Sequence, residues 1–451
     1  MASAKKEAAL TPEERLQAAL VPDWERPYKL PENWCWTTVG AINQYVGISA
    51  DPTKAKNKAF ELYSVPSSAD NYPEIVLGAD IGSTKQSVKK GDVLLCKINP
   101  RINRVWKVSK YTDHSLLASS EWIVIRNSGL ISNYLMWCFR SPYFRGYMLS
   151  NVSGVGGSLM RAQPKFVQGY PVPVPPLAEQ QRIVDRIESL FAKLDEAKEK
   201  AQAVVDSFET RKAAILHKAF TGELTKKWRK SANTRWVYKK IKDCCKLGSG
   251  GTPSRKVPDF YKGDIPWIKT GEIEWNDIYD TEEKITQSAI DNSSARCYKP
   301  GVVLVAMYGM GVTRGKASIL RVQAATNQAV CVLEPQSALL YNRYLLYYFM
   351  RNYWDIREKA VGGNQLNLSL TIIKELNIEI PPIDEQVEIV QILDDLFAKE
   401  QQTKEAAEAV LDQIDLMKKS ILARAFRGEL GTNDPSEESA VELLKEIIRR
   451  G

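Results

Sequence analysis

The sequence predicts an α+β protein made of two copies of one structural plan, each copy being a globular domain followed by a long helix. Residues 177–224 recur as residues 383–430 at a constant offset of 206 without a gap, and 22 of the 48 aligned positions are identical. The predicted strands and helices of both copies lack the regular alternation of an α/β protein. The recurring segment itself carries a heptad stripe of apolar residues. An internal duplication explains these observations together.

Composition narrows the class of protein only a little. The chain has 451 residues, of which 44% are hydrophobic and 26% charged, as in ordinary soluble proteins. Its net charge of +8 weakly favours a polyanionic partner. The first residues lack the apolar core of a signal peptide, and no run approaches the ~18 apolar residues of a membrane helix. We therefore expect a cytoplasmic protein.

The first 29 residues are predicted to form a lead-in segment. Thr11 can cap a helix that has Pro12 in its first turn and Glu14 at the third position, and the helix is expected to run to about Leu20. Val21-Pro22 ends it.

The two globular domains are predicted at residues 30–174 and 234–380, and they share a frame. Each opens with a strand, continues with a glycine turn and two more strands, and then has an aromatic-rich helix. The paired segments are 34–39 with 236–241, 90–96 with 300–306, 119–125 with 326–332, and 133–140 with 342–353. Each domain closes with two glycines, Gly156-Gly157 or Gly362-Gly363, a short strand and Pro-Pro. The other loops diverge, which suggests one task performed on two different targets.

The long helices are predicted within residues 175–224 and 381–430. The first apolar stripe has a four-three spacing interrupted by Arg211 and comprises Ile183, Ile187, Leu190, Leu194, Ala197, Ala201, Val204, Phe208 and Ile215. The second comprises Ile389, Leu393, Leu396, Ala407, Val410, Ile414, Met417 and Ile421. Glu400 and Thr403 interrupt the second stripe. A locally frayed or solvated stretch is the favoured interpretation of this interruption, and polar residues that fix the register are the alternative.

Neither helix can bury its stripe alone, so we expect the two to pair in a coiled coil. At 1.5 Å per residue, about 42 helical residues span roughly 60 Å. The spacing leaves parallel and antiparallel pairing open, and antiparallel pairing would relate the two domains by a pseudo-twofold axis. Gly222 and Gly428 are expected to cap the helices. A basic linker (225–233) and a tail (431–451) with a short amphipathic helix around 439–450 follow them.

The sequence offers little material for catalysis or metal binding. The chain has only two histidines, and its seven cysteines form no Cys-x-x-Cys pair, so reduced thiols without a metal are expected. The Asn- or Asp-Pro-Pro-aromatic loop that amino-methyltransferases of DNA need is absent. Residues 309–317 fail the phosphate-loop pattern at Met310 and Ala317 and are predicted to form a basic strand-to-strand turn.

Together these motifs resemble the specificity subunit of type I restriction-modification systems. The similarity rests on two variable α+β regions, each followed by a helix that begins after Pro-Pro with Glu-Gln and ends in Ala-Phe-x-Gly-Glu-Leu. It covers essentially the whole chain. The Met310-Gly311 pair departs from the usual family turn, which leaves the geometry of that turn open.

The resemblance implies a non-catalytic DNA reader. Each globular region would be a target recognition domain for one half of a bipartite sequence, and antiparallel helices would fix the gap between the halves. Two modification subunits would supply S-adenosylmethionine-dependent methyl transfer, and restriction subunits would supply the ATP- and Mg-dependent nuclease. No cofactor is expected in this chain itself.

Cationic and amide side chains that could read bases or anchor phosphates gather in a few loops. The candidate DNA-binding residues are Lys97, Arg101, Asn103, Arg104, Lys107, Arg255, Lys256, Lys269, Arg314 and Lys316. The ends of the repeated helices are the candidate docking surface for partners, with Glu179, Gln180, Phe191, Phe220, Glu385, Gln386, Phe397 and Phe426. Two other classes remain open: the recognition subunit of a two-subunit system that cuts on both sides of its site, and a coiled-coil protein scaffold without DNA binding.

Overall fold

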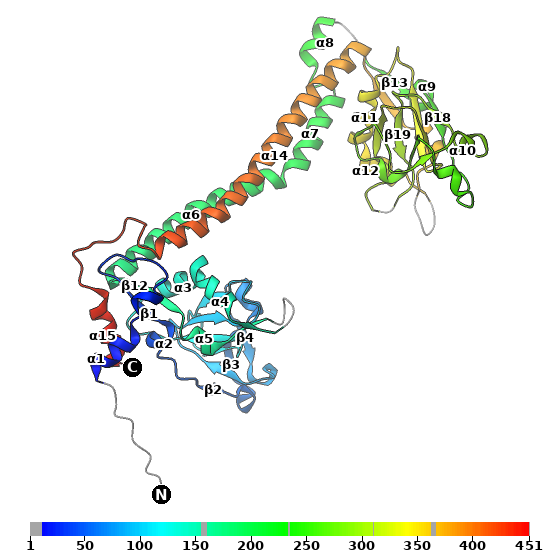
Figure 1. The fold of residues 1–451 in the computed structure, drawn as a ribbon. Helices are drawn as coiled ribbons and strands as arrows, with labels where there is room; N and C mark the ends of the chain where they lie inside the picture. Colours follow the sequence, from blue (N-terminus) through cyan, green and yellow to red (C-terminus); the bar gives the residue numbers. More distant parts are fainter. Residues whose placement is uncertain (1–10, 155–159, 233–234, 310, 362–366, 451) are drawn as a thin grey trace. The chain divides into compact units, whose positions relative to one another are not determined.

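The computed structural model describes residues 11–154, 160–232, 235–309, 311–361 and 367–450. The chain divides into two compact units (Figure 1). Unit 1 comprises residues 1–201 and 409–451, and unit 2 comprises residues 202–408. Each unit therefore contains one globular domain together with a part of both long helical segments. The glycine pairs expected at 156–157 and 362–363 lie outside the described residues.

Unit 1 contains small sheets covered by short helices. A five-stranded sheet has the order β2-β5-β8-β3-β4, a three-stranded sheet has the order β7-β6-β9, and β1 pairs antiparallel with β12. The strands are β1 (Cys35–Thr38), β2 (Ser49–Ala50), β3 (Ala59–Tyr63), β4 (Glu74–Leu77), β5 (Lys85–Ser87), β6 (Val93–Cys96), β7 (Val105–Lys107), β8 (Ser115–Ala118), β9 (Trp122–Ile125), β10 (Val152–Ser153), β11 (Arg161–Ala162) and β12 (Pro171–Val174). The helices are α1 (Pro12–Ala19), α2 (Val39–Ile42), α3 (Ser132–Arg140), α4 (Pro142–Ser150), α5 (Pro164–Val167), most of α6 (Leu177–Asp206) and α15 (Ala440–Arg450).

Unit 2 has two larger sheets and one strand pair. The orders are β14-β22-β19-β20-β16 and β17-β15-β21-β18, and β13 pairs antiparallel with β23. The strands are β13 (Val237–Lys240), β14 (Cys245–Ser249), β15 (Ile265–Ile268), β16 (Asp277–Ile278), β17 (Lys284–Ile285), β18 (Cys297–Tyr298), β19 (Val303–Ala306), β20 (Ala317–Leu320), β21 (Ala324–Thr326), β22 (Val330–Pro335) and β23 (Asn377–Ile380). The helices are α7 (Phe208–Phe220), α8 (Lys226–Ala232), α9 (Ile241–Cys244), α10 (Gln287–Asp291), α11 (Asn342–Arg351), α12 (Tyr353–Glu358), α13 (Leu370–Lys374) and much of α14 (Ile383–Ala425).

A common frame recurs in the two units. The pair β1·β12 corresponds to β13·β23, and the run β7-β6-β9 corresponds to β20-β19-β22. In each unit the last strand of that run leads to two successive helices, α3 and α4 or α11 and α12. Because the remaining sheets differ in strand number and order, the expectation of one frame with divergent additions is confirmed.

Within each unit the two long helical segments run antiparallel (Figure 1). In unit 1, Asp195 pairs with Lys418, and Lys198 lies 3.6 Å from Asp415. As the residue number on α6 increases, the number of its partner on α14 decreases, as an antiparallel pair requires.

Unit 2 shows the same direction between α7 and α14. Phe208 lies under the ammonium of Lys404, and the ring of Phe397 lies 5.5 Å from Lys212 Nζ. Between these two contacts Arg211 Nε bonds to Glu400 Oε2 at 2.7 Å. Arg211 therefore pairs with Glu400, one of the two polar residues that interrupt the second stripe. The other, Thr403, is exposed and donates its hydroxyl to the Lys399 carbonyl at 2.8 Å.

This pairing corrects the favoured interpretation of the second stripe. Glu400 lies inside the unbroken helix α14, so a frayed or solvated stretch is wrong there. The interruption falls in the first copy, where α6 ends at Asp206 and α7 begins at Phe208. Ser207 Oγ donates to the Ala203 carbonyl at 2.6 Å, which competes with the helical backbone bonds.

One further expectation about the helical segments needs correction. Val410 and Met417 belong to the predicted apolar seam, but they are 40% and 49% exposed, so the seam is not buried at these two positions. The basic linker predicted at 225–233 contains helix α8. Arg229 on α8 donates to Glu385, which anchors this helix to the start of α14.

The ends of the long helical segments pack into the globular domains. Phe220 contacts Tyr344 in unit 2, with ring centroids 4.9 Å apart, and Phe426 contacts Tyr134 in unit 1 at 5.4 Å. Gly222 and Gly428 follow with φ of 72° and 75°, as the expected glycine caps require.

The expected terminal helices are also present. Thr11 forms a capping box with Glu14 at the start of α1. Helix α15 buries Leu444 and Ile447 in the core of unit 1.

Candidate nucleic-acid interface

Two strand-to-strand turns occupy equivalent places in the common frame. The first turn, residues 97–104, connects β6 with β7, and the second turn, residues 307–316, connects β19 with β20. The basic strand-to-strand turn predicted around residues 309–317 is thus confirmed, except for Met310, which lies outside the described residues. Each turn carries an exposed aliphatic side chain, Ile102 at 48% and Val312 at 59% exposure.

The candidate DNA-binding residues of unit 1 lie on the first turn or just after it. Arg101 is exposed, whereas Lys97 and Arg104 are half-buried. Asn103 Nδ2 donates to the Arg140 carbonyl at 2.9 Å, and Lys107 Nζ donates to Asn133 Oδ1 at 2.5 Å. Asn103 and Lys107 therefore also link the turn and β7 to helix α3.

The candidates of unit 2 lie in two places. Arg314 and Lys316 belong to the second turn, and Lys316 pairs with Glu274. Arg255, Lys256 and Lys269 lie outside that turn. Residues from distant parts of the sequence are thus brought to two local sites.

Arg255 and Lys269 converge on one carboxylate. Arg255 Nη2 lies 2.7 Å and Lys269 Nζ 3.0 Å from Glu283. The Arg255 guanidinium also stacks 4.1 Å from the Tyr261 ring centroid. The hydrogen bond to Glu283 raises the pKa of Lys269, and Lys269 with Arg255 lowers the pKa of Glu283, so both groups stay charged at neutral pH. Lys256 is exposed beside this cluster.

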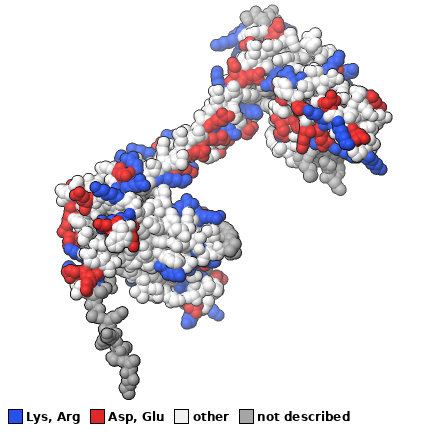
Figure 2. Space-filling view, in the orientation of Figure 1, with Lys and Arg blue, Asp and Glu red and all other residues white. Residues whose placement is uncertain are grey.

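Ion pairs of this kind hold the cationic side chains in place, and the carboxylate partner can still be exchanged for another anion. An exposed pair is weak, so a phosphate can replace the carboxylate as partner of the cation. On the face in Figure 2, Lys and Arg side chains alternate with Asp and Glu over both units. This face is therefore mixed in charge.

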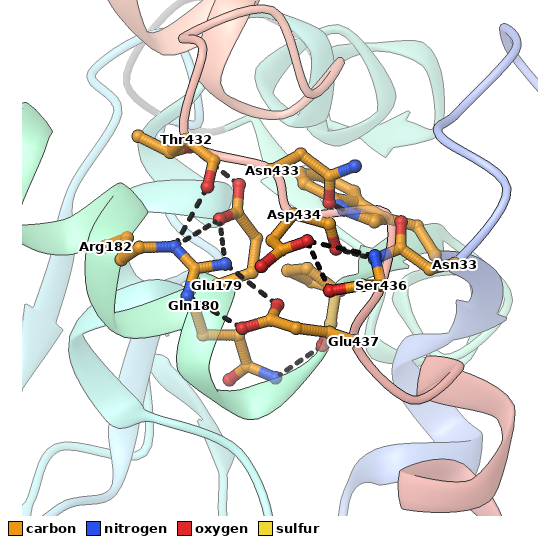
Figure 3. Close-up of polar contacts among 11 residues, drawn as sticks. Asn33, Glu179, Gln180, Arg182, Thr432, Asn433, Asp434, Ser436 and Glu437 are labelled. Atoms are coloured by element: carbon orange, nitrogen blue, oxygen red, sulfur yellow. Dashed lines mark hydrogen bonds and ion pairs between the residues drawn. The ribbon is translucent and has the colours of Figure 1, made fainter.

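Glu179 and Gln180, in the first turn of the first long helix, are buried in unit 1, and Figure 3 shows the polar contacts around them. Glu179 accepts hydrogen bonds from Thr432 Oγ1 at 2.6 Å and from Arg182 Nε at 3.0 Å. Arg182 in turn bonds to Glu437 at 2.7 and 2.8 Å. Burial raises the pKa of Glu179 above its ordinary value, although these hydrogen bonds oppose the effect. Glu179 thus fastens the C-terminal tail to α6.

Unit 2 repeats this arrangement with other residues. Glu385 accepts from Thr225 Oγ1 at 2.7 Å and from Arg229 Nε at 3.0 Å. In each unit, therefore, the segment after the end of one long helical segment is bonded to the start of the other.

Glutamines complete the two arrangements. Gln180 Oε1 accepts from the Ile131 amide at 3.0 Å, and Gln386 Oε1 accepts from the Tyr341 amide at 2.8 Å. Both amides lie at the N-terminal ends of the aromatic-rich helices α3 and α11. The glutamines thereby tie each globular domain to its own long helix.

The eight candidate docking residues thus differ in accessibility. Six have internal partners and are at most 5% exposed: Glu179, Gln180, Phe220, Glu385, Gln386 and Phe426. Phe191 and Phe397 are half-buried and lie against Trp137 and Tyr347. The six buried side chains stabilise the chain itself, and docking of partners at these helix ends stays a prediction.

Sequence reasoning missed the side chains that hold the candidate cations and turns. These side chains are Glu283 and Glu274, which pair with candidate cations, and Arg145 and Arg357, which bond to the backbone of the two turns. No local pattern marks these residues, since their partners lie far away in the sequence.

In the part of the chain that the structure describes, no helix is long and apolar enough to cross a membrane. Among those same residues, no group of three or more His, Cys, Asp or Glu side chains could hold a metal ion.

Fold and site together define a duplicated α+β protein with paired antiparallel helices and one basic strand-to-strand turn in each copy. Residues 233–411 match the type I restriction modification DNA specificity domain. The chain is 24% identical over 455 residues to the EcoKI specificity subunit of Escherichia coli K12, covering 93% of this chain and 96% of that protein. It is 29% identical over 183 residues to the MjaIX specificity subunit of Methanocaldococcus jannaschii, covering 39% and 41%.

Solved structures share the fold. The HsdS subunit of Thermoanaerobacter tengcongensis aligns with a TM-score of 0.64 at 20% identity, covering 90% of this chain and all of that one. A chain from a study of assembly and conformational transition of the type I restriction-modification system aligns with a TM-score of 0.69, also at 20% identity and with the same coverage. The chain is thus similar over nearly its whole length to a specificity subunit of a type I restriction-modification system, and residues 233–411 match the DNA specificity domain of that family.

Proposed function

We propose that each unit reads one half of a bipartite DNA sequence, unit 1 through the first turn and its neighbours and unit 2 through the second turn and the Arg255–Lys269 cluster. One observation carries this proposal. The two turns occupy equivalent places in one duplicated frame, yet their sequences differ. Equivalent position implies the same task, and different side chains imply different bases.

The paired helices serve as the spacer between the two readings. Their register is supported in unit 1 by the pair Asp195–Lys418 and in unit 2 by Arg211–Glu400. A polar pair within an apolar seam favours one register over the others, because a shifted register would leave both charges without partners.

Catalysis belongs to partner subunits on this proposal. Two modification subunits bind S-adenosylmethionine and methylate adenine, and restriction subunits use ATP and Mg²⁺ to cut DNA. The complex works in the cytoplasm. This chain contributes DNA recognition and the docking of partners. The half-buried Phe191 and Phe397 are accessible candidates for docking.

A domain exchange tests the proposal. Residues 30–174 are replaced by the equivalent region of another specificity subunit, and the assembled methylating complex is assayed on DNA with randomised sequence. Only one half of the methylated sequence is expected to change. The matched exchange of residues 234–380 should change only the other half, and a change of both halves, or of neither, in either chimera contradicts the assignment.

Salt dependence separates DNA reading from a protein scaffold. Phosphate contacts release counterions, so the affinity of the assembled complex for DNA must fall steeply with salt concentration. A complex that assembles but shows no salt-dependent DNA binding refutes DNA recognition by this chain.

A further inference from the structure

The two turns share a feature beyond their position in the frame: a helix-borne arginine bonds to the backbone of each. Arg357 on α12 donates from Nη1 to the Arg314 carbonyl and from Nη2 to the Gly311 carbonyl, both at 2.6 Å. Arg145 on α4 donates from Nη2 to the Arg101 carbonyl. The helices α4 and α12 occupy the same place after α3 and α11. The same device thus occurs twice with different surrounding residues.

Packing around Arg357 fixes the second turn further. Tyr353, one helical turn earlier on α12, donates its hydroxyl to the Val312 carbonyl. A Cβ added to Gly315, whose φ is +90°, would lie 3.2 Å from Arg357 Cγ. The turn therefore lies directly against α12, and three of its carbonyls accept hydrogen bonds from this helix.

The first turn is fastened in a comparable way. Asn103 Nδ2 donates to the Arg140 carbonyl at 2.9 Å, at the end of α3, and Arg140 Nη2 donates to the Val105 carbonyl at 2.7 Å. Within the turn, Asn99 has a φ of 46°, a left-handed conformation that asparagine tolerates. Helices α3 and α4 thus hold this turn at several points.

Side chains on the neighbouring helices thus bond to the backbone of each turn, while one aliphatic side chain of each turn stays exposed. The tips, Ile102 and Val312, remain 48% and 59% exposed. An exposed aliphatic tip on a fixed backbone suits contact with a thymine methyl group or a base step. A guanidinium offers several donors in a rigid plane, and bonds from a charged donor are stronger than neutral ones.

We propose that Arg145 and Arg357 are positioning residues, each holding the shape of the turn that reads one DNA half-site. The inference rests on the proposed function, since it presumes that the turns face DNA. A turn that is already ordered loses less conformational entropy on binding and offers its side chains in one arrangement. Removing the arginine therefore lowers the discrimination between base pairs in one half-site and leaves the other half-site unaffected.

The test uses the complete methylating complex and a DNA library in which both half-sites are randomised. In Arg357→Gln, discrimination between cognate and substituted base pairs is expected to drop by about tenfold in the half-site of unit 2 only, since one base contact contributes roughly that factor or more. Arg145→Gln should give the reciprocal result. Arg357→Lys, which keeps a charged donor without the planar fork, should restore part of the discrimination.

Two controls keep the outcomes distinct. Arg351→Gln changes an exposed arginine of the same unit that bonds to Asn352, and it should leave both half-sites unchanged. Val312→Glu places a negative charge on the exposed tip of the second turn, and it should abolish reading of one half-site if the turn faces DNA.

Each result then has one meaning. If Val312→Glu leaves methylation unchanged, the turn does not face DNA, and the assignment of this turn under the proposed function fails together with the inference. If Val312→Glu disrupts one half-site while Arg357→Gln leaves discrimination intact, only the positioning role is overturned. Equal loss of methylation on all sequences in Arg357→Gln also overturns it, because a general loss of folding or assembly has no preference for one half-site.

Discussion

The pair Arg211–Glu400 offers a quantitative test of the helix pairing in unit 2. Its Nε–Oε2 distance is 2.7 Å, and the two side chains are 32% and 22% exposed. Fully exposed pairs contribute about 0.2–1 kcal/mol, and removing one partner of a buried pair costs about 3–5 kcal/mol. For this intermediate burial we expect a coupling free energy of about 1–2 kcal/mol between Arg211→Ala and Glu400→Ala.

The assay is urea unfolding of the full chain, followed by circular dichroism at a helical wavelength, for both single variants and the double variant. The matched control is the more exposed pair Asp195–Lys418, with side chains 56% and 23% exposed, for which the coupling should stay below about 1 kcal/mol. Arg211 also donates to the Val204 carbonyl at 3.1 Å, so Arg211→Ala should cost more than Glu400→Ala. Equal coupling energies for the two pairs would refute the argument that Arg211–Glu400 fixes the register.

Two further predictions concern the spacer and the helix ends. Deleting residues 195–201 together with 412–418, blocks that face each other through Asp195–Lys418, removes about 10 Å of paired helix. The spacer of the methylated sequence should shorten by about one to three base pairs, with both half-sites retained, and an unchanged spacer contradicts the ruler. Phe426→Ala should lower the free energy of unfolding by about 3–5 kcal/mol, because Phe426 is fully buried. Phe191→Ala, at a half-buried site, should lower the free energy of unfolding far less. Loss of partner binding in Phe426→Ala without loss of stability would contradict this expectation and support docking at Phe426.

Much of the frame could be predicted from the sequence because it depends on local signals. The cap at Thr11, the glycine at Gly222 and the heptad spacing of the long helices each depend on residues a few positions apart. Because the chain is duplicated, a strand, turn or helix predicted in one copy supported the prediction of its counterpart in the other copy. Strand positions followed from apolar runs after glycine turns in the same way.

The rest depends on contacts between residues far apart in the sequence, which no periodicity encodes. Glu179 meets Thr432, and Arg357 meets the backbone of residues 311–314. Whether Glu400 lies in a solvated stretch or in a polar pair is decided by Arg211 on the other helix. The heptad spacing therefore predicted the apolar seam, but only the tertiary structure shows which residue pairs with each polar residue in it.

The same limit applies to the candidate interface. The sequence shows lysines and arginines in predicted loops, but it does not show that Glu283 and Glu274 are their partners. Each of these pairs joins residues that are far apart in the sequence. The Glu-Gln pairs at the starts of the long helices were predicted as docking surface because they lie at the ends of the repeated helices. Their burial gives a second physical reason for the recurrence: each pair fastens a globular domain to the long helices.

The central claim is that two units of one frame read two separate half-sites. Single-molecule sequencing of methylated adenines, in cells that carry this chain with its modification subunits, measures it most directly because both half-sites and their gap appear in one readout. Methylation is expected at one bipartite sequence with a fixed unspecified gap, and this methylation should disappear when this chain is removed. A contiguous methylated sequence, a gap of variable length, or methylation that persists without this chain would contradict it.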